Sequence, residues 1–195
     1  MIAALFVRPD GPYAGRDDVD AWPEERDARA YAGPWPVIAH PPCQAWGRLA
    51  HVREVTCGRR RGEDAGCFAS AVASVRAYGG VLEHPEGSRA FYRYHLPIPR
   101  FGEGWTAGLF GWSVAVDQAV YGHPARKRTW LFWFGEGAPP NVSIDDGSAL
   151  ATHVVVKSRR LSGVRLPELG KRRRELSPPA FADLMINLAR ASRPS

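Results

Sequence analysis

The sequence has no long apolar stretch and no leader-like beginning, and both absences narrow the class of protein. Its apolar runs fall far short of the roughly 18 residues that a membrane-spanning helix needs. No positively charged segment followed by an apolar one opens the chain, so no secretory leader is predicted. The sequence therefore predicts a soluble protein of the cell interior, without a membrane partner.

Cysteine is scarce, and its spacing is not that of a common metal site. Cysteines at positions 43, 57 and 67 are odd in number, which argues against a disulfide framework. A zinc protein is an alternative, but His40-x-x-Cys43 and the Cys57 to Cys67 spacing match no common structural zinc pattern. A zinc-dependent deaminase is disfavoured because no His-x-Glu is paired with Pro-Cys-x-x-Cys. No metal is predicted, although five side chains are candidate ligands: His40, Cys43, His51, Cys57 and Cys67.

What the chain does contain is typical of one globular domain. Of its 195 residues, 45% are hydrophobic and 24% charged, which is ordinary usage for a folded protein. It has 17 prolines and 20 glycines, which indicate short elements joined by many loops. Because no internal repeat or linker divides the sequence, residues 1–195 are predicted to form a single compact domain.

Charge is unevenly distributed along the chain. The net charge is +6, and acidic residues crowd the first third. The basic residues form clusters that favour a polyanionic partner, most simply nucleic acid. Solvated basic loops are the alternative explanation. The clusters are Arg59-Arg60-Arg61, Arg126-Lys127-Arg128, Lys157 with Arg159-Arg160, and Lys171-Arg172-Arg173-Arg174.

The order of the apolar segments predicts an α/β fold. Short unbroken apolar runs at Ile2–Val7, Val37–Ala39 and Val81–Glu83 are typical of strands buried in a parallel sheet. Between the last two, small and apolar residues recur at helical spacing from Glu63 to Tyr78, and two glycines follow. A helix that crosses over between two strands makes those strands parallel.

The remaining segments are predicted from their composition and caps. Prolines and glycines indicate a loop over 8–22 and irregular structure over 96–111. Two further strands are expected over 113–117 and 129–134, with an edge strand over 152–156. Helices are expected over 23–31, 45–54, from Ser88 to Tyr94, and after Ser177-Pro178-Pro179.

Cys43 follows the strand Val37–Ala39 on a stiff loop. Each proline of His40-Pro41-Pro42-Cys43 fixes its own φ and restricts the residue before it, so Cys43 has little freedom. A cysteine held in this way suits a nucleophile, while the alternative is a small buried hydrophobe. Sites in open parallel sheets form outside the carboxyl ends of strands, so Glu83 at the next strand end is expected close to Cys43.

Four ordered segments resemble those of the C5-type cytosine DNA methyltransferases, in particular their very small phage-encoded relatives. Pro41-Pro42-Cys43-Gln44 is similar to the family's Pro-Pro-Cys-Gln, and Glu83-His84 to its Glu-Asn, with histidine replacing asparagine. The segment from Tyr121 to Arg128 resembles Tyr-Gly-x-Pro-Gln-x-Arg-x-Arg, with Ala125 replacing glutamine. The helix after Ser177 resembles the family's C-terminal helix. The resemblance implies a reduced, mostly parallel, Rossmann-like methyltransferase domain.

The family's chemistry then implies roles for individual residues. Cys43 would add to C6 of a flipped cytosine, Glu83 would protonate N3, and Arg128 would complete the catalytic set. DNA would contact Gln44, Arg48, Arg126, Lys127 and Arg128. The methyl donor would be S-adenosylmethionine, held by residues at and after the end of the first predicted strand and by Pro41 after Val37–Ala39: Phe6, Gly11, Gly15, Asp20 and Pro41.

The resemblance leaves partners and alternatives open. Little room lies between Phe134 and Ser177 for a target-recognition domain, so specificity is expected to be low or supplied by an accessory protein or a homodimer. The setting implied is the cytoplasm of a bacterium or phage-infected cell. An enzyme that uses another donor or another pyrimidine is one alternative, and a catalytically inactive DNA-binding relative is another.

Overall fold

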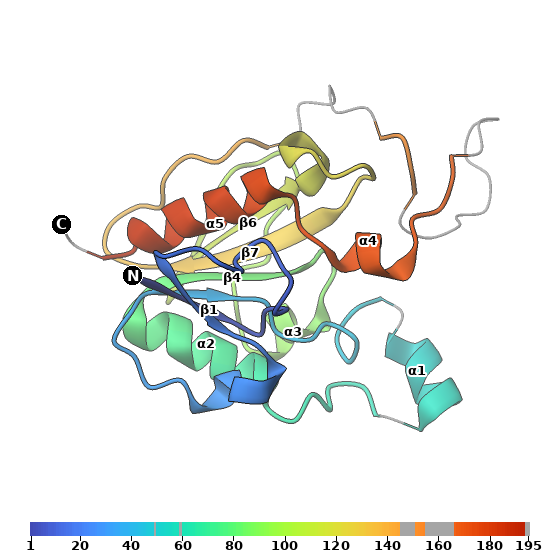
Figure 1. Cartoon of the computed structure of the whole chain (residues 1–195), viewed down its shortest axis with the longest axis horizontal. Helices are drawn as coiled ribbons and strands as arrows, with labels where there is room; N and C mark the ends of the chain where they lie inside the picture. The colour runs from blue at the N-terminus through green and yellow to red at the C-terminus, as the bar shows by residue number, and fades with distance from the viewer. Residues whose placement is uncertain (49, 59, 145–150, 155–165, 194–195) are drawn as a thin grey trace.

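A seven-stranded sheet lies between two long helices, with α2 (Cys67–Tyr78) on one face and α5 (Pro179–Arg190) on the other (Figure 1). This structure is a computed structural model that describes residues 1–48, 50–58, 60–144, 151–154 and 166–193. The layered arrangement confirms the predicted α/β class. No helix in these ranges is long and apolar enough to cross a membrane.

The sheet is mixed, in the order β2-β1-β3-β4-β7-β6-β5. The pairs β1–β2, β1–β3 and β3–β4 are parallel, whereas the longer pairs β4–β7 and β6–β7, together with β5–β6, are antiparallel. The predicted mostly parallel sheet is therefore not confirmed. The strands are β1 (Ile2–Leu5), β2 (Val19–Trp22), β3 (Val37–Ala39), β4 (Gly80–Pro85), β5 (Thr106–Gly108), β6 (Gly111–Asp117) and β7 (Arg128–Phe134).

Connection length explains the antiparallel half. A parallel pair needs a crossover of about a dozen residues or more, usually with a helix. Residues 118–127 between β6 and β7 form a turn with one short 3₁₀ helix, η3 (Gln118–Tyr121), so β7 must run back beside β6. The longer segment between β3 and β4 contains α2, and this pair is parallel as predicted.

Successive side chains of the central strands point to opposite faces of the sheet, and a core lies on each face. In β1 and β3, Ala3, Leu5 and Val37 pack on the α2 side, while Ala4 and Ile38 pack on the α5 side. Both strands are buried along their whole length, which explains their unbroken apolar sequences. The helices complete the two cores with Phe68, Val72 and Val75 from α2, and Phe181, Met185 and Leu188 from α5.

Several predicted bounds are corrected by local capping. The helix expected from Glu63 begins at Cys67, because the Asp64 carboxylate accepts hydrogen bonds from the Gly66 and Phe68 amides. The helix expected over 23–31 is two 3₁₀ turns, η1 (Glu24–Arg26) and η2 (Ala28–Ala30), separated by Asp27 at φ 46°. The Ser88 cap is confirmed, since its hydroxyl accepts from the Ala90 amide at the start of α3 (Arg89–Arg93).

Other differences concern short or exposed elements. The helix expected over 45–54 is α1 (Ala50–Cys57), which stands apart from the layered body (Figure 1). β2 and β5 were not predicted, and α4 (Lys171–Glu175) is an additional short helix. Of the predicted edge strand over 152–156, His153 and Val154 form isolated bridges and the rest lies outside the described residues. The basic cluster of Lys157, Arg159 and Arg160 also lies outside them.

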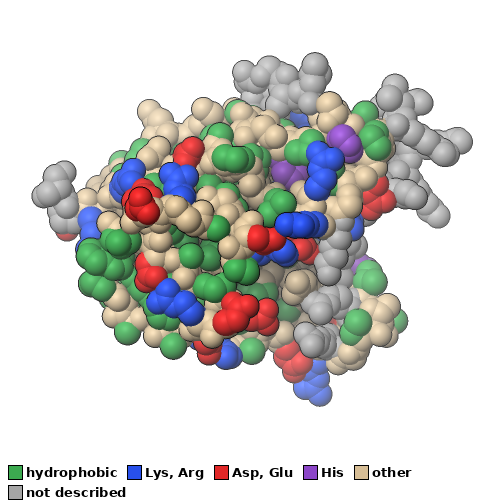
Figure 2. All heavy atoms as spheres, viewed as in Figure 1, with side chains coloured by type: hydrophobic (Ala, Val, Ile, Leu, Met, Phe, Trp, Pro, Cys, Tyr) green, Lys and Arg blue, Asp and Glu red, His purple; other side chains and the backbone are tan. Residues whose placement is uncertain are grey.

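The charges that are separated along the sequence are interleaved on the folded surface. Figure 2 shows basic and acidic side chains mixed over the face viewed. Asp10 accepts from Arg172 at 2.8 Å, and Asp18 pairs with Arg190 of α5. Arg61 is 2.6 Å from Glu54. Many arginines of the predicted basic clusters are thus partly neutralised, and the remaining positive charge is local.

Candidate functional site

The loops that follow β1, β3 and β4 meet at one edge of the sheet. The order β2-β1-β3-β4 reverses direction at β1, because β2 lies on one side of it and β3 on the other. In open α/β sheets, ligands bind outside the carboxyl ends of strands at such a switch point. The Cys43 loop follows β3, Glu83 lies near the end of β4, and the loop containing Tyr13 follows β1.

Three polar side chains from these elements, two of them buried and the third, His40, half-buried, form a hydrogen-bonded chain. The Tyr13 hydroxyl is 2.9 Å from His40 Nε2, and His40 Nδ1 is 3.1 Å from Glu83 Oε2. Tyr13 and Glu83 are only 3% and 9% exposed. The parallel register of Ala39 beside Leu82 brings the next residues, His40 and Glu83, together. Buried polar groups arranged in this way are fixed in orientation.

Glu83 is held as a carboxylate. Burial would raise the pKa of Glu83, but the hydrogen bond and charge of His40, with the positive charge of Lys127, outweigh it and lower the pKa to about 2. At neutral pH, Glu83 is therefore ionised in the free protein. It accepts hydrogen bonds, and it must first receive a proton before it can act as an acid.

Cys43 is a half-buried free thiol close to this carboxylate. Burial raises the pKa of Cys43 and the charge of Glu83 raises it further, while the charge of Lys127 lowers it. Cys43 and Glu83 belong to neighbouring strand ends, since Ala39 pairs with Leu82, but Glu83 by itself disfavours the thiolate. Lys127 is the cation that favours it.

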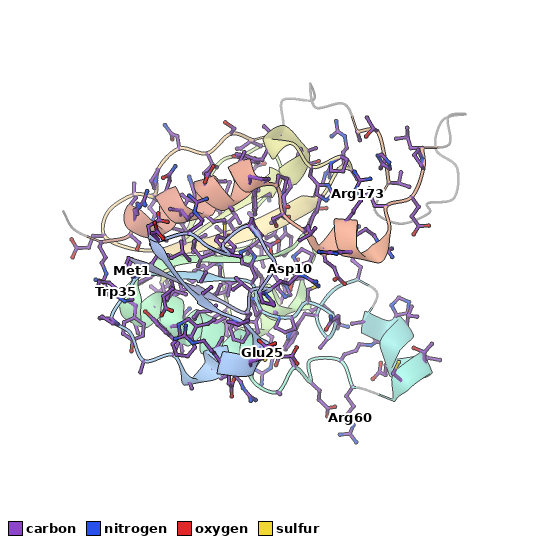
Figure 3. The ribbon with its side chains drawn as sticks, in the orientation of Figure 1. Met1, Asp10, Glu25, Trp35, Arg60 and Arg173 are labelled. Atoms are coloured by element: carbon purple, nitrogen blue, oxygen red, sulfur yellow. The ribbon has the colours of Figure 1, made fainter. Side chains whose placement is uncertain are left out.

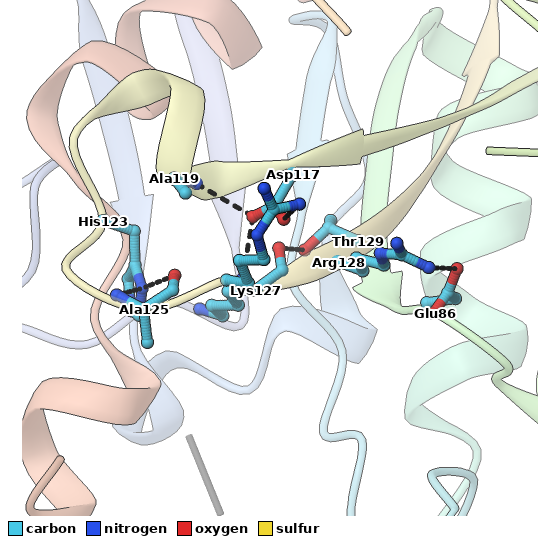
Figure 4. A network of polar contacts seen from close by, with 9 residues as sticks. Glu86, Asp117, Ala119, His123, Ala125, Lys127, Arg128 and Thr129 are labelled. Atoms are coloured by element: carbon cyan, nitrogen blue, oxygen red, sulfur yellow. Dashed lines mark hydrogen bonds and ion pairs between the residues drawn. The ribbon is translucent and has the colours of Figure 1, made fainter. Parts of the chain in front are cut away.

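Hydrogen bonds to the backbone amide and carbonyl of Lys127 fix the position of this residue (Figure 4). Its amide donates to the buried Asp117 carboxylate at 2.8 Å, and its carbonyl accepts from the Thr129 hydroxyl at 3.2 Å and the Gln118 amide at 3.1 Å. Burial lowers the pKa of Lys127, whereas the charges of Glu83 and Cys43 raise it. Lys127 precedes β7, whose first residues pair with the end of β4, so the antiparallel register places Lys127 at the same sheet edge as Glu83.

Arg128, the predicted catalytic arginine, is directed elsewhere. Its Nη1 lies 3.7 Å from Glu86 Oε1, and its guanidinium lies 4.1 Å above the Phe101 ring (Figure 4). Arg126 Nη1 is 4.0 Å from Asp117 Oδ2. The predicted DNA contacts Gln44 and Arg48 are exposed on the Cys43 loop, with Arg48 3.9 Å from Glu86. Within the cluster Arg126-Lys127-Arg128, Lys127 is the residue whose charge lowers the pKa of Cys43.

The five residues predicted to hold the methyl donor differ in their surroundings. Both Asp20 oxygens are engaged, one by Trp22 Nε1 at 2.8 Å and the other by Arg26 at 2.6 Å. Pro41 is buried, and the Gly11 amide closes a turn on the Arg8 carbonyl at 3.1 Å. Phe6 adopts φ 58° and packs against the core, whereas Gly15 borders open space. Asp20 is the carboxylate among them, so a ribose would have to share or displace its contacts with Trp22 and Arg26.

The candidate zinc ligands do not gather. Among the described residues, no group of three or more His, Cys, Asp or Glu side chains is placed to hold a metal ion. His51 Nδ1 is 3.0 Å from the Arg48 carbonyl, and Cys57 is exposed on α1. His40 is engaged by Tyr13 and Glu83 instead.

His84, which replaces the asparagine of the resembling family, is a buried structural histidine. Its Nδ1 is 2.6 Å from the Ser88 hydroxyl, and its ring meets Phe68 edge-on at 5.1 Å between centroids. Burial lowers the pKa of His84 from 6.5 to about 4. Between these values the unfolded chain binds a proton that the folded chain does not, so stability falls as the pH falls.

We expect the free energy of unfolding to fall by roughly 3 kcal/mol as the pH is lowered from 6.5 to 4. Urea denaturation at a series of pH values measures this fall. In the His84→Asn variant most of the slope should disappear, although His123, whose pKa is also lowered by burial, keeps part of it. Equal slopes for the two proteins would show that His84 titrates normally.

Comparisons of the chain with protein-family models, curated proteins and solved structures find no match. Its function is therefore inferred from the geometry of the site. Two site residues were not singled out in these roles from the sequence, Tyr13 and Lys127. Tyr13 lies in a loop rich in proline and glycine, and no sequence pattern marks it as a site residue. Lys127 could have been identified by aligning the segment from Tyr121 position by position with Tyr-Gly-x-Pro-Gln-x-Arg-x-Arg, whose first arginine falls on it.

Proposed function

We propose that this chain modifies a pyrimidine base of DNA, with cytosine as the first candidate, by adding Cys43 Sγ to C6 of the base. The observation that carries the proposal is the convergence of Cys43, ionised Glu83 and Lys127 from three segments at one sheet edge. A nucleophile with a carboxylate and a cation in reach is the arrangement that covalent addition to a base requires.

The addition balances in protons. Cys43 loses its thiol proton as the Sγ–C6 bond forms, the C5=C6 electron pair shifts to C4–C5, and the C4=N3 pair moves onto N3. N3 then takes a proton, so the net transfer is from the thiol to N3. Glu83 and His40, 3.1 Å apart, are the pair that accepts the proton from the Cys43 thiol and passes it to N3 of the base. C5 is left electron-rich and attacks an electrophile.

Lys127 is the cation assigned to the thiolate. Counted from Tyr121, the first arginine of Tyr-Gly-x-Pro-Gln-x-Arg-x-Arg falls on Lys127 and the second on Thr129. Arg128 occupies the position between them, in agreement with its contact to Glu86. Lys127 therefore takes the catalytic place first predicted for Arg128, and Arg128 remains a predicted DNA contact.

Exchanging Lys127 for methionine is expected to slow formation of the Cys43 adduct by about tenfold or more at neutral pH, because the thiolate loses the positive charge of Lys127 that favours it. Arg128→Met is the matched variant. It is expected to weaken DNA binding but to leave the rate at saturating DNA within about twofold. Single-turnover rates at saturating DNA distinguish the two, and a larger rate loss in Arg128→Met would reverse the assignment.

The electrophile is a separate question. S-adenosylmethionine is predicted as the donor from the resemblance alone, and the Asp20 carboxylate expected near it is engaged by Trp22 and Arg26. S-adenosylmethionine stays a prediction and the first donor to supply in a test, as do a homodimer and an accessory protein as partners. Cys43, Glu83 and Lys127 would act on the base in the same way in an enzyme that uses another donor.

The test is covalent trapping by a DNA duplex that contains 5-fluorocytosine. Fluorine at C5 cannot be lost as a proton is, so a base that has accepted an electrophile at C5 stays bonded to Cys43. We expect a DNA–protein complex that survives denaturation when S-adenosylmethionine is supplied and that is absent with a cytosine duplex. Binding to the duplex without any such complex, with each donor offered, would instead favour the inactive DNA-binding alternative.

A further inference from the structure

A hollow of about 240 Å³ adjoins the Cys43 loop on the side of α1. Its walls come from the loop after β3 and from the segment that precedes α2. This volume is below the roughly 300–1,000 Å³ of pockets for drug-sized ligands, so it suits a single planar ring system. Its polar and charged lining residues are Gln44, Arg60, Glu63 and Asp64.

The two walls are tied to each other, which makes the hollow a fixed feature of the fold. The Gly62 amide donates to the Ala45 carbonyl at 3.0 Å. Trp46 Nε1 donates to Asp64 Oδ2 at 2.8 Å, and the same carboxylate caps α2 through the Phe68 amide at 2.8 Å. Asp64 is thus fully engaged in holding the walls, and its oxygens are not available to a ligand.

The lining combines flat apolar surface with a few polar groups. Pro42, Ala45, Ala50 and Ala65 supply the apolar part. Glu63 Oε2 accepts from the Arg60 amide at 3.3 Å, which leaves its other oxygen as an acceptor. Gln44 is exposed and forms no side-chain hydrogen bond with the described residues. Apolar walls with a carboxylate and an amide at the rim match the faces and edges of a nucleobase.

Position and charge indicate which nucleobase occupies it. Pro42 and Gln44 flank Cys43 directly, so an occupant lies next to the base that Cys43 attacks. The Arg60 side chain extends away from the body of the protein (Figure 3), so it would reach a phosphate of bound DNA rather than the ring. Enzymes that act on flipped bases set their sequence context through contacts to the flanking nucleotides.

We propose that this hollow binds one unpaired nucleobase next to the target in the same DNA strand, and that Glu63 makes it prefer a base with an exocyclic amino group over thymine. Adenine, cytosine and guanine offer an exocyclic amino group to the Glu63 oxygen. Thymine offers only its N3–H, which lies between two carbonyl oxygens that repel a carboxylate. This deepens the proposed function, since it rests on DNA as the substrate, and it gives the chain a means of reading sequence within its single sheet-and-helix unit.

The test measures binding rather than chemistry, so it uses the full chain with Cys43→Ala. Single-stranded oligonucleotides with one cytosine differ in the base on either side of it, and their affinities are compared by fluorescence anisotropy. For one side, we expect about tenfold weaker binding with thymine than with the three amino-bearing bases. Glu63→Gln, which can donate as well as accept, should reduce this difference to less than about twofold.

The matched control is Glu136→Gln. Glu136 is also exposed, but it follows β7, whose end lies at the opposite edge of the sheet from the ends of β3 and β4. This variant should keep the discrimination against thymine. Equal affinity for all four bases on both sides, or discrimination that survives Glu63→Gln, would overturn the proposal.

The two proposals fail in different ways. Covalent trapping without any flanking-base preference counts against the hollow and leaves the Cys43 chemistry standing. A flanking preference that depends on Glu63 without trapping supports the hollow and counts against the Cys43 chemistry. No binding to any oligonucleotide overturns both.

Discussion

The Cys43→Ser variant is expected to form no covalent complex with a 5-fluorocytosine duplex, while it still binds the duplex. A serine hydroxyl at the same position is a far weaker nucleophile than a thiol at neutral pH, because almost none of it is ionised. Glu83, with its pKa lowered to about 2, is a poor base for a hydroxyl. Denaturing electrophoresis of the mixture with wild-type and variant protein measures the effect.

Cys67→Ser provides the matched control. Cys67 is also a half-buried free cysteine whose pKa is raised, first by burial and then by the charge of Asp64. It begins α2, away from Lys127, so its replacement should leave trapping unchanged. A covalent complex that persists in Cys43→Ser, or one that is lost in Cys67→Ser, would remove Cys43 from the role of nucleophile.

The second large effect is expected for Glu83→Gln. The amide keeps the shape and can still bond His40, but it cannot carry the proton from the thiol to N3. We expect the single-turnover rate of adduct formation to fall by about 10²- to 10⁴-fold, the usual range for loss of a general acid–base group. Rapid-quench measurements at saturating DNA separate this rate from binding.

Glu86→Gln is the matched control for that variant, because Glu86 lies close in the sequence and pairs only with exposed arginines. Its rate should stay within about threefold of the wild type, since ion pairs of this kind contribute little. The Glu83 variant must also be folded. Its stability is compared above pH 5, because the pKa of Glu83 is lowered from 4.5 to about 2 and its contribution is lost only as the pH falls through that interval. A Glu83→Gln rate equal to the wild-type rate would exclude Glu83 as the proton carrier.

Much of the fold could be predicted because buried strands have recognisable apolar sequences. β1 and β3 are covered on both faces, and their unbroken apolar runs indicate this directly. β2 is half-exposed along its length and contains Asp20, so no pattern distinguishes it from the loop around it. The antiparallel half of the sheet depends on whether the chain turns back after Asp117, which connection length indicates better than composition.

The site could be predicted only as far as strand ends determine it. Cys43 and Glu83 follow from their places after β3 and within β4. The choice between Lys127 and Arg128 depends on which way neighbouring side chains point, and adjacent residues entering a strand point to opposite faces. Tyr13 reaches His40 across 27 positions of sequence, a contact that no local pattern reports.

The charge distribution gives a similar lesson. Separate acidic and basic regions of sequence suggested a broad basic surface, but folding pairs Asp10 with Arg172 and Asp183 with Arg16. Such exposed pairs contribute little to stability, yet they lower the net field over much of the surface. The DNA partner proposed here therefore rests on the cations beside Cys43 and on the rim of the hollow rather than on net charge.

Nucleoside mass spectrometry of cellular DNA tests the central claim most directly. DNA is hydrolysed from cells that express the wild-type chain, the Cys43→Ser variant or neither. We predict a modified pyrimidine nucleoside in the first sample alone, and its mass identifies the group added; a methyl group would identify the donor class as well. Identical nucleoside profiles in all three samples, with the protein present and folded, would contradict the account.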